Sequence, residues 1–151
     1  MDQLSIKTRI SQELVAALKN KDMQRVSILR LISAALAARE KELFSKGVEG
    51  PLSDEECLSV LQKEAKKRKE SIAAFEAGGR ADLAEQERKE LTLLQEFLPA
   101  ELSEAEIVSI IEEVIASGAA DFGSVMRGVM AKVGGRADGK AVSELIKARL
   151  K

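Results

Sequence analysis

The sequence has no histidine, tryptophan or tyrosine, and it contains one cysteine, two prolines and four phenylalanines. Without histidine and with a single thiol, the chain cannot form a Ser-His-Asp triad, a Cys-His pair or a zinc site of imidazole and thiolate ligands. The scarcity of aromatic rings also removes the platforms on which single-stranded RNA modules stack bases. We therefore predict no catalytic residue, no metal site and no cofactor.

Long hydrophobic runs are also missing. No stretch approaches the roughly 18 apolar residues that cross a membrane. The first residues, MDQLSIKTRISQEL, are amphipathic and charged where a secretory signal peptide needs an apolar block. We therefore expect a cytoplasmic protein without a membrane partner. Cys57 alone excludes an intramolecular disulfide, and its place beside Leu58 near an apolar stripe favours a packing role.

What the chain does contain is helix-forming sequence. Hydrophobic residues make up 45% and charged residues 32% of the 151 residues, which is a globular balance. Apolar residues recur at the spacing of an α-helix, and no segment shows the strict alternation of a strand. We predict an all-α fold with helices over residues 3–20, 22–45, 53–78, 81–97, 103–117, 122–133 and 139–150.

Proline divides this helical chain. Pro99 disfavours a helical residue before it and lacks the amide donor that a continuing helix requires, so we place a domain boundary there. We predict an N-terminal subdomain of four helices, including long ones, over residues 1–99, and a three-helix C-terminal subdomain over residues 100–151. The four phenylalanines lie near apolar stripes, and we predict that they belong to the core.

Two short segments have the signature of a helix start. Ser53 with Glu56, and Ser103 with Glu106, both match the capping box. In that motif the serine side chain accepts from the third helical amide while the glutamate reaches back to the serine amide. We predict a helix start at each serine.

The segment KEAKKRKE, residues 63–70, is mostly basic, and we interpret its lysines as a solvated face. Arg68 differs because it falls within the apolar stripe of its helix, while Glu87 and Glu90 interrupt the equivalent stripe of the next one. An unpaired charge between two helices would be strongly unfavourable. We therefore predict that Arg68 pairs with one of these glutamates.

The stretch VGGRADGKAV, residues 133–142, nearly matches the phosphate-binding loop G-x-x-x-x-G-K-[ST]. Ala141 stands where that loop needs a hydroxyl for magnesium, and the preceding residues have helical spacing where the loop requires a strand. We interpret the stretch as a joint between two helices.

The C-terminal third is electrically divided. Residues 100–120 carry a charge of −5, whereas residues 121–151 contain seven basic and three acidic residues, giving +4. Such a basic module suits contacts with phosphates. Ordinary surface lysines and arginines explain the same charge equally well, so both readings stay open on charge alone.

Three blocks carry a family resemblance: KKRKESIAAFEAGGRADLAEQERKELTLLQEFLP, ELSEAEI and GSVMRGVMAKVGGRADGKAV. They contain, in order, the motifs R-x-E-S, G-R-x-D-L, E-L-x-L-L-x-x-F-L-P and V-M-x-x-V-M-x-K-V-x-G-R-A-D-G. Together they resemble the YqeY family, also called GatB/YqeY domain proteins, over essentially the whole chain.

The resemblance implies a two-subdomain helical fold whose second part is similar to the tail domain of the B subunit of the tRNA-dependent amidotransferase. That tail helps to hold the tRNA body, so the implied partners are tRNA and amidotransferase subunits or other translation-related proteins. Family members are often labelled carbon-nitrogen ligases with glutamine as amido-N-donor. In the amidotransferase, the ammonia-producing and ATP-using chemistry belongs to other domains.

The tail-like basic positions of this sequence are Lys132, Arg136 and Lys140. Gly134 stands where the family commonly has lysine, and Arg127 where it commonly has glycine, so one cation is lost from the joint and one is gained a turn earlier. The predicted nucleic-acid-binding residues are Arg127, Lys132, Gly135, Arg136, Lys140 and Lys147.

We predict a non-catalytic protein that associates with tRNA through phosphate and sugar, because helices and lysines without aromatics suit backbone recognition. The alternative is a helical protein-protein adaptor without nucleic-acid binding, in which a groove of the N-terminal subdomain docks another chain. A true amidotransferase would need a nucleophile with an activating base, which the residues do not supply.

Overall fold

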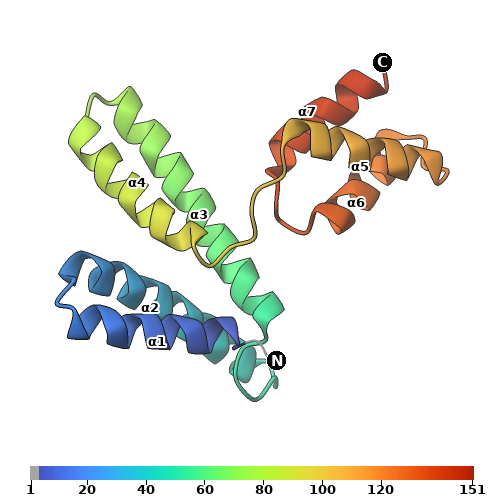
Figure 1. The fold of residues 1–151 in the computed structure, drawn as a ribbon. Helices are drawn as coiled ribbons and strands as arrows, with labels where there is room; N and C mark the ends of the chain where they lie inside the picture. The colour runs from blue at the N-terminus through green and yellow to red at the C-terminus, as the bar shows by residue number, and fades with distance from the viewer. Residues whose placement is uncertain (1–3) are drawn as a thin grey trace. The chain divides into compact units, whose positions relative to one another are not determined.

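The structure is a computed structural model, and it describes residues 4–151. Within that range the chain forms helices and no strands, which confirms the all-α prediction (Figure 1). The helices are α1 (Ile6–Lys19), α2 (Met23–Ser45), α3 (Asp54–Ala77), α4 (Ala81–Gln95), α5 (Glu104–Ala116), α6 (Phe122–Val133) and α7 (Gly139–Arg149). The predicted start of the first helix at Gln3 lies outside the described residues.

Two details of the predicted helix ends are wrong. Helix α4 ends at Gln95, before the predicted Phe97, because the Phe97 amide donates to Leu94 O at 3.1 Å and the chain tightens into turns. At the start of α3, Ser53 accepts from the Glu56 amide at 3.2 Å as predicted, but the Glu56 carboxylate contacts Arg39 of α2 instead. The capping box of α5 is complete on both sides.

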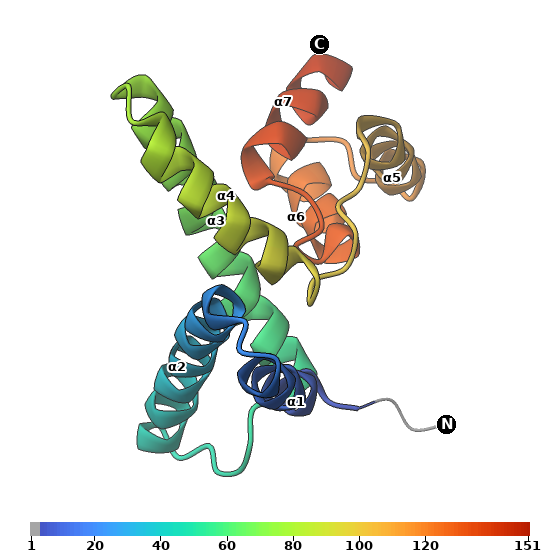
Figure 2. The ribbon, with the colours of Figure 1, turned by 60° about the vertical axis from the view of Figure 1, so that its left-hand side comes forward.

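The described residues form two compact units, one ending at Leu98 and the other beginning at Pro99. In the first unit, α1 and α2 lie side by side, α3 and α4 form a second antiparallel pair, and the first half of α3 packs on α1 and α2 (Figure 2). Its core joins side chains from all four helices, including the fully buried Leu29, Cys57 and Leu61.

The second unit packs α5, α6 and α7 around a core of β-branched residues. Val125, Val129 and Val133 of α6 are fully buried in it. Gly128 lets α6 approach α5 closely, because a Cβ atom at this position would lie 2.7 Å from Val114 Cγ1.

The prediction that all four phenylalanines belong to the core is confirmed for Phe97 alone, since Phe75 is half-buried and lies in neither core cluster. Phe97 is buried, whereas Phe44 is 65% exposed and Phe122 is 39% exposed. Both exposed rings lie at helix ends. Helix α2 has 23 residues and α1 has 14, so the last turn of α2, which carries Phe44, extends past the start of α1.

Arg68 pairs across α3 and α4, as predicted. Its Nε lies 3.0 Å from Glu90 Oε2 and 3.5 Å from Glu87 Oε2, and its side chain is 19% exposed. Glu64 completes a group of three carboxylates around one guanidinium. Burial, and next the charge of Glu90, raise the pKa of Glu87, while Arg68 opposes them.

Candidate functional site

The predicted nucleic-acid-binding residues lie on α6, α7 and the turn between them. Arg127 and Lys132 belong to α6, Gly135 and Arg136 to the turn, and Lys140 and Lys147 to α7. The Lys147 Nζ lies 5.8 Å from the centroid of the Phe122 ring, at the opposite end of α6 from the turn. The set is therefore spread along α6, a helix of 12 residues, or about 18 Å.

The turn between α6 and α7 is a helix joint and not a phosphate loop of the strand-to-helix kind. Gly134 ends α6 in the left-handed conformation, with φ of 57°, and Gly135 follows with φ of 83°. The Arg136 guanidinium folds back, donating from Nε to Val133 O at 3.0 Å and from a terminal nitrogen to Lys132 O at 3.0 Å. Arg136 therefore caps the carbonyl end of α6.

Two cations of this unit pair with the acidic residues of α5. Lys132 Nζ lies 3.3 Å from Glu113 Oε2, and the Arg149 guanidinium makes two contacts with the Glu112 carboxylate, one of them at 3.2 Å. The hydrogen bond from Arg149 lowers the pKa of Glu112 and raises that of Arg149. All four side chains are about half exposed, so solvent screens both pairs and they contribute little to stability.

The start of α7 carries a basic residue that has no partner within residues 99–151. Lys140 is exposed and makes no ion pair or hydrogen bond within the described part of the chain. The N-cap residue, Asp138, makes no side-chain hydrogen bond to the first turn of α7. The first amides of a helix and its dipole favour an anion, so Lys140 and these amides can act on the same phosphate.

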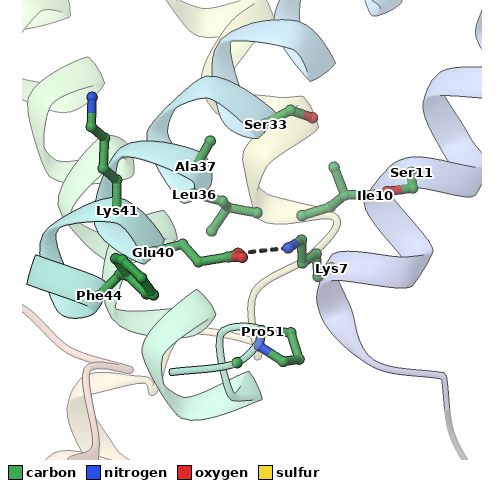
Figure 3. Close-up of a pocket in the computed structure, with 11 residues that line it drawn as sticks. Lys7, Ile10, Ser11, Ser33, Leu36, Ala37, Glu40, Lys41, Phe44 and Pro51 are labelled. Carbon is green, nitrogen blue, oxygen red and sulfur yellow. Dashed lines mark hydrogen bonds and ion pairs between the residues drawn. The ribbon is translucent and has the colours of Figure 1, made fainter. Parts of the chain in front are cut away.

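The first unit has a groove, the feature that the adaptor alternative requires, but its residues were not predicted from the sequence. Helix α1 and the C-terminal half of α2 form its walls, the loop at Gly50 and Pro51 completes the lining, and its volume is about 630 Å³ (Figure 3). An ion pair of 2.6 Å between Lys7 and Glu40 spans from one helix to the other. The exposed ring of Phe44 lies at its mouth.

The signal that could have revealed the groove is a second stripe on α2. Its members follow helical spacing beside the buried stripe but are small or polar before they end in an aromatic ring. They are Ser33, Ala37, Glu40 and Phe44. An aromatic residue on such a stripe indicates a surface rather than a core position.

Other candidate chemistries find no support among residues 4–151. No group of three or more His, Cys, Asp or Glu side chains there could hold a metal ion. Cys57 is fully buried, and burial raises the pKa of its thiol, which favours packing over reactivity. No helix in the described range has both the length and the hydropathy to cross a membrane.

Comparison with known proteins finds one family model and two individual proteins that are similar to this chain. The family model described as Yqey-like protein matches residues 7–150. A protein of Pyrenophora tritici-repentis is 30% identical to this chain over 145 residues, which covers 91% of this chain and 77% of the relative. That relative is named altered inheritance of mitochondria protein 41, mitochondrial. A Schizosaccharomyces pombe protein described as uncharacterized is 32% identical over 94 residues, covering 62% of this chain and 72% of the relative.

Proposed function

Because the chain belongs to the YqeY-like protein family, we propose that it is a non-catalytic, tRNA-associated protein whose C-terminal unit contacts the phosphate backbone. The resemblance of this unit to the amidotransferase tail domain supplies the class of ligand. The observation that carries the proposal is the exposed, unpaired Lys140 at the uncapped start of α7. The glycine turn beside it leaves room for a backbone to approach, since a Cβ at Gly134 would meet nothing within 4 Å.

The ion pairs to α5 are compatible with this role. Lys132 and Glu113 are 53% and 64% exposed, so a phosphate can replace the carboxylate at little cost. The nearby glutamates still repel a polyanion, and we therefore expect modest affinity. Contacts with three to five phosphates give a log-log slope of binding constant against salt of roughly −2 to −4.5.

The test is a salt titration of tRNA binding with two matched double variants. Lys132→Ala with Lys140→Ala removes two candidate contacts, and Lys19→Ala with Lys89→Ala removes the same charge from exposed positions of the first unit. Arg136 stays intact because it caps α6. We expect the first variant to flatten the slope by about 1.5 and the second to leave it unchanged. Equal slopes for the two variants would remove this surface from the proposal.

A second candidate function is protein-protein adaptation without nucleic-acid binding. The groove between α1 and α2 favours it, because a 65% exposed phenylalanine beside an apolar floor is typical of a protein-binding surface. If purified protein shows no salt-sensitive association with tRNA while groove variants alter partner binding, the adaptor candidate replaces the first.

A further inference from the structure

We propose that the groove between α1 and α2 binds an amphipathic helix of a partner protein, one that carries acidic residues beside its apolar face. The inference deepens the adaptor candidate by naming the class of partner, and it rests on the first unit alone. It does not require the C-terminal unit to bind nucleic acid.

The groove has the shape that a helix needs. Part of it is lined by the short side chains of Ser11, Ser33 and Ala37, which let a third helix approach the two walls. Packed helices lie about 8–10 Å apart, and small residues at the contact favour the lower end. The 14 residues of α1 span about 21 Å, which accommodates a partner helix of about four turns.

Apolar side chains lie toward both ends of this strip of small residues. Val15 is 51% exposed and Leu18 is 43% exposed, and their spacing of four and then three residues from Ser11 puts them on the same face of α1. Phe44 of α2 provides the aromatic anchor at the mouth. Solvation of these side chains is unfavourable, so burial under an apolar helix face stabilises the complex.

The charges of the lining select an acidic partner. Lys7 is neutralised by Glu40 across the groove. Lys41 also lines the groove and makes no ion pair or hydrogen bond within residues 4–151. Two cations and one carboxylate leave the lining positive, so a glutamate or aspartate at the edge of the partner helix gains a contact with Lys41, whereas a lysine there is repelled.

A helix fits better than an extended peptide. Extended peptides bind by adding a strand to an exposed sheet edge or, when Pro-rich, in grooves lined by several aromatic rings. The described part of this chain has no strand that could serve as such an edge. Phe44 is the one aromatic residue among residues 4–151 that lines this groove. Helix-in-groove binding instead uses apolar anchors at helical spacing, which the two walls match.

The experiment is a selection from a display library of 16-residue amphipathic helices. The apolar face is built from Leu, Ile, Val and Met, and the flanking positions vary among Glu, Gln and Lys. We expect purified full-length protein to enrich peptides with acidic flanks. Phe44→Ser should weaken binding of an enriched peptide at least tenfold, and Lys41→Glu should abolish the preference for acidic flanks.

The matched control is Leu31→Ser, because Leu31 is 49% exposed on the same helix but does not line the groove. It should leave peptide binding unchanged. The proposal is overturned if no helix is enriched, if flanks of either charge are enriched equally, or if Leu31→Ser weakens binding as much as Phe44→Ser. A dimer of the wild-type protein that Phe44→Ser dissociates would also overturn it, since a second copy would then occupy the groove. None of these outcomes depends on tRNA binding.

Discussion

Arg68 lies among three half-buried carboxylates between α3 and α4, those of Glu64, Glu87 and Glu90. Removing its charge takes from Glu87 and Glu90 the cation that contacts both, while Glu64 keeps its contact with the exposed Lys67. Breaking a fully buried pair costs about 3–5 kcal/mol. The side chains here retain 15–20% exposure, so solvent relieves part of that cost and we expect about 2 kcal/mol.

Arg68→Met should therefore lower the melting temperature by about 10 °C, since 1 kcal/mol corresponds to about 4–8 °C in a domain of 60–100 residues. Circular dichroism measures the shift. Arg68→Lys keeps a charge at the position and should recover part of the loss. An unchanged melting temperature for Arg68→Met would show that the pair does not stabilise the fold.

Glu87 gives a prediction with a defined pH dependence. Its pKa is raised in the folded state, chiefly by burial, so the folded protein binds a proton more tightly than the unfolded chain does. Ionised Glu87 therefore destabilises the fold above the raised pKa. As pH falls toward the unfolded value of about 4.3, the folded state takes up the proton and the penalty disappears.

Glu87→Gln imitates the protonated form, so it should raise the melting temperature at pH 7 by a few degrees and have a smaller effect near pH 4. Glu85→Gln is the control, because Glu85 lies on the same helix with its side chain 60% exposed. If Glu87→Gln lowers the melting temperature at pH 7, its attraction to Arg68 outweighs the cost of burial.

At the scale of elements, the contact between α5 and α6 depends on Gly128. In an open helix, replacing glycine with alanine stabilises by about 1 kcal/mol. Here the added Cβ would lie 2.7 Å from Val114 Cγ1, and the buried Val114 cannot move freely. Overpacking of this kind costs about 1–3 kcal/mol, which exceeds the gain in helix propensity.

Gly128→Ala should therefore destabilise the C-terminal unit by about 1 kcal/mol net. Chemical denaturation of the variant checks the sign. Adding Val114→Ala removes the atoms that the new methyl group meets, so the double variant should be less destabilised than the sum of the two single variants. Strict additivity would indicate that no clash occurs.

The elements themselves could be predicted from sequence because each depends on local spacing and caps. The Ser103 cap and the glycine that ends α6 are examples of such local signals. The ion-pair partners of the basic residues could not be predicted in this way. Lys132 meets Glu113, which lies 19 residues away in sequence, and the partner of Arg149 lies 37 residues away.

The groove could be predicted only in part, because the stripe on α2 is a local signal but the wall that α1 supplies is not. It exists because α2 is longer than α1 and because small side chains line the space between them. The Arg68 pair was different, since a lone charge on an apolar stripe requires a partner and the next helix offered only glutamates on its own stripe. Burial cost alone identified that contact.

For the whole molecule, the charge of the C-terminal unit limits any binding of nucleic acid. The −5 of residues 100–120 nearly cancels the +4 of residues 121–151. Long-range attraction of a polyanion is therefore weak, and binding must depend on contacts within about one Debye length, near 8 Å at physiological salt. Local geometry at Lys140 matters more than net charge.

The two units have separate hydrophobic cores, one in residues up to Leu98 and one from Pro99 onward. We expect Arg68→Met to accelerate amide hydrogen exchange in α1–α4 and Gly128→Ala to accelerate it in α5–α7, each leaving the other unit unchanged, because local opening follows the core that is weakened. The double variant should show both effects at their single-variant size. Loss of protection in both units from either substitution would mean that they unfold as one cooperative body.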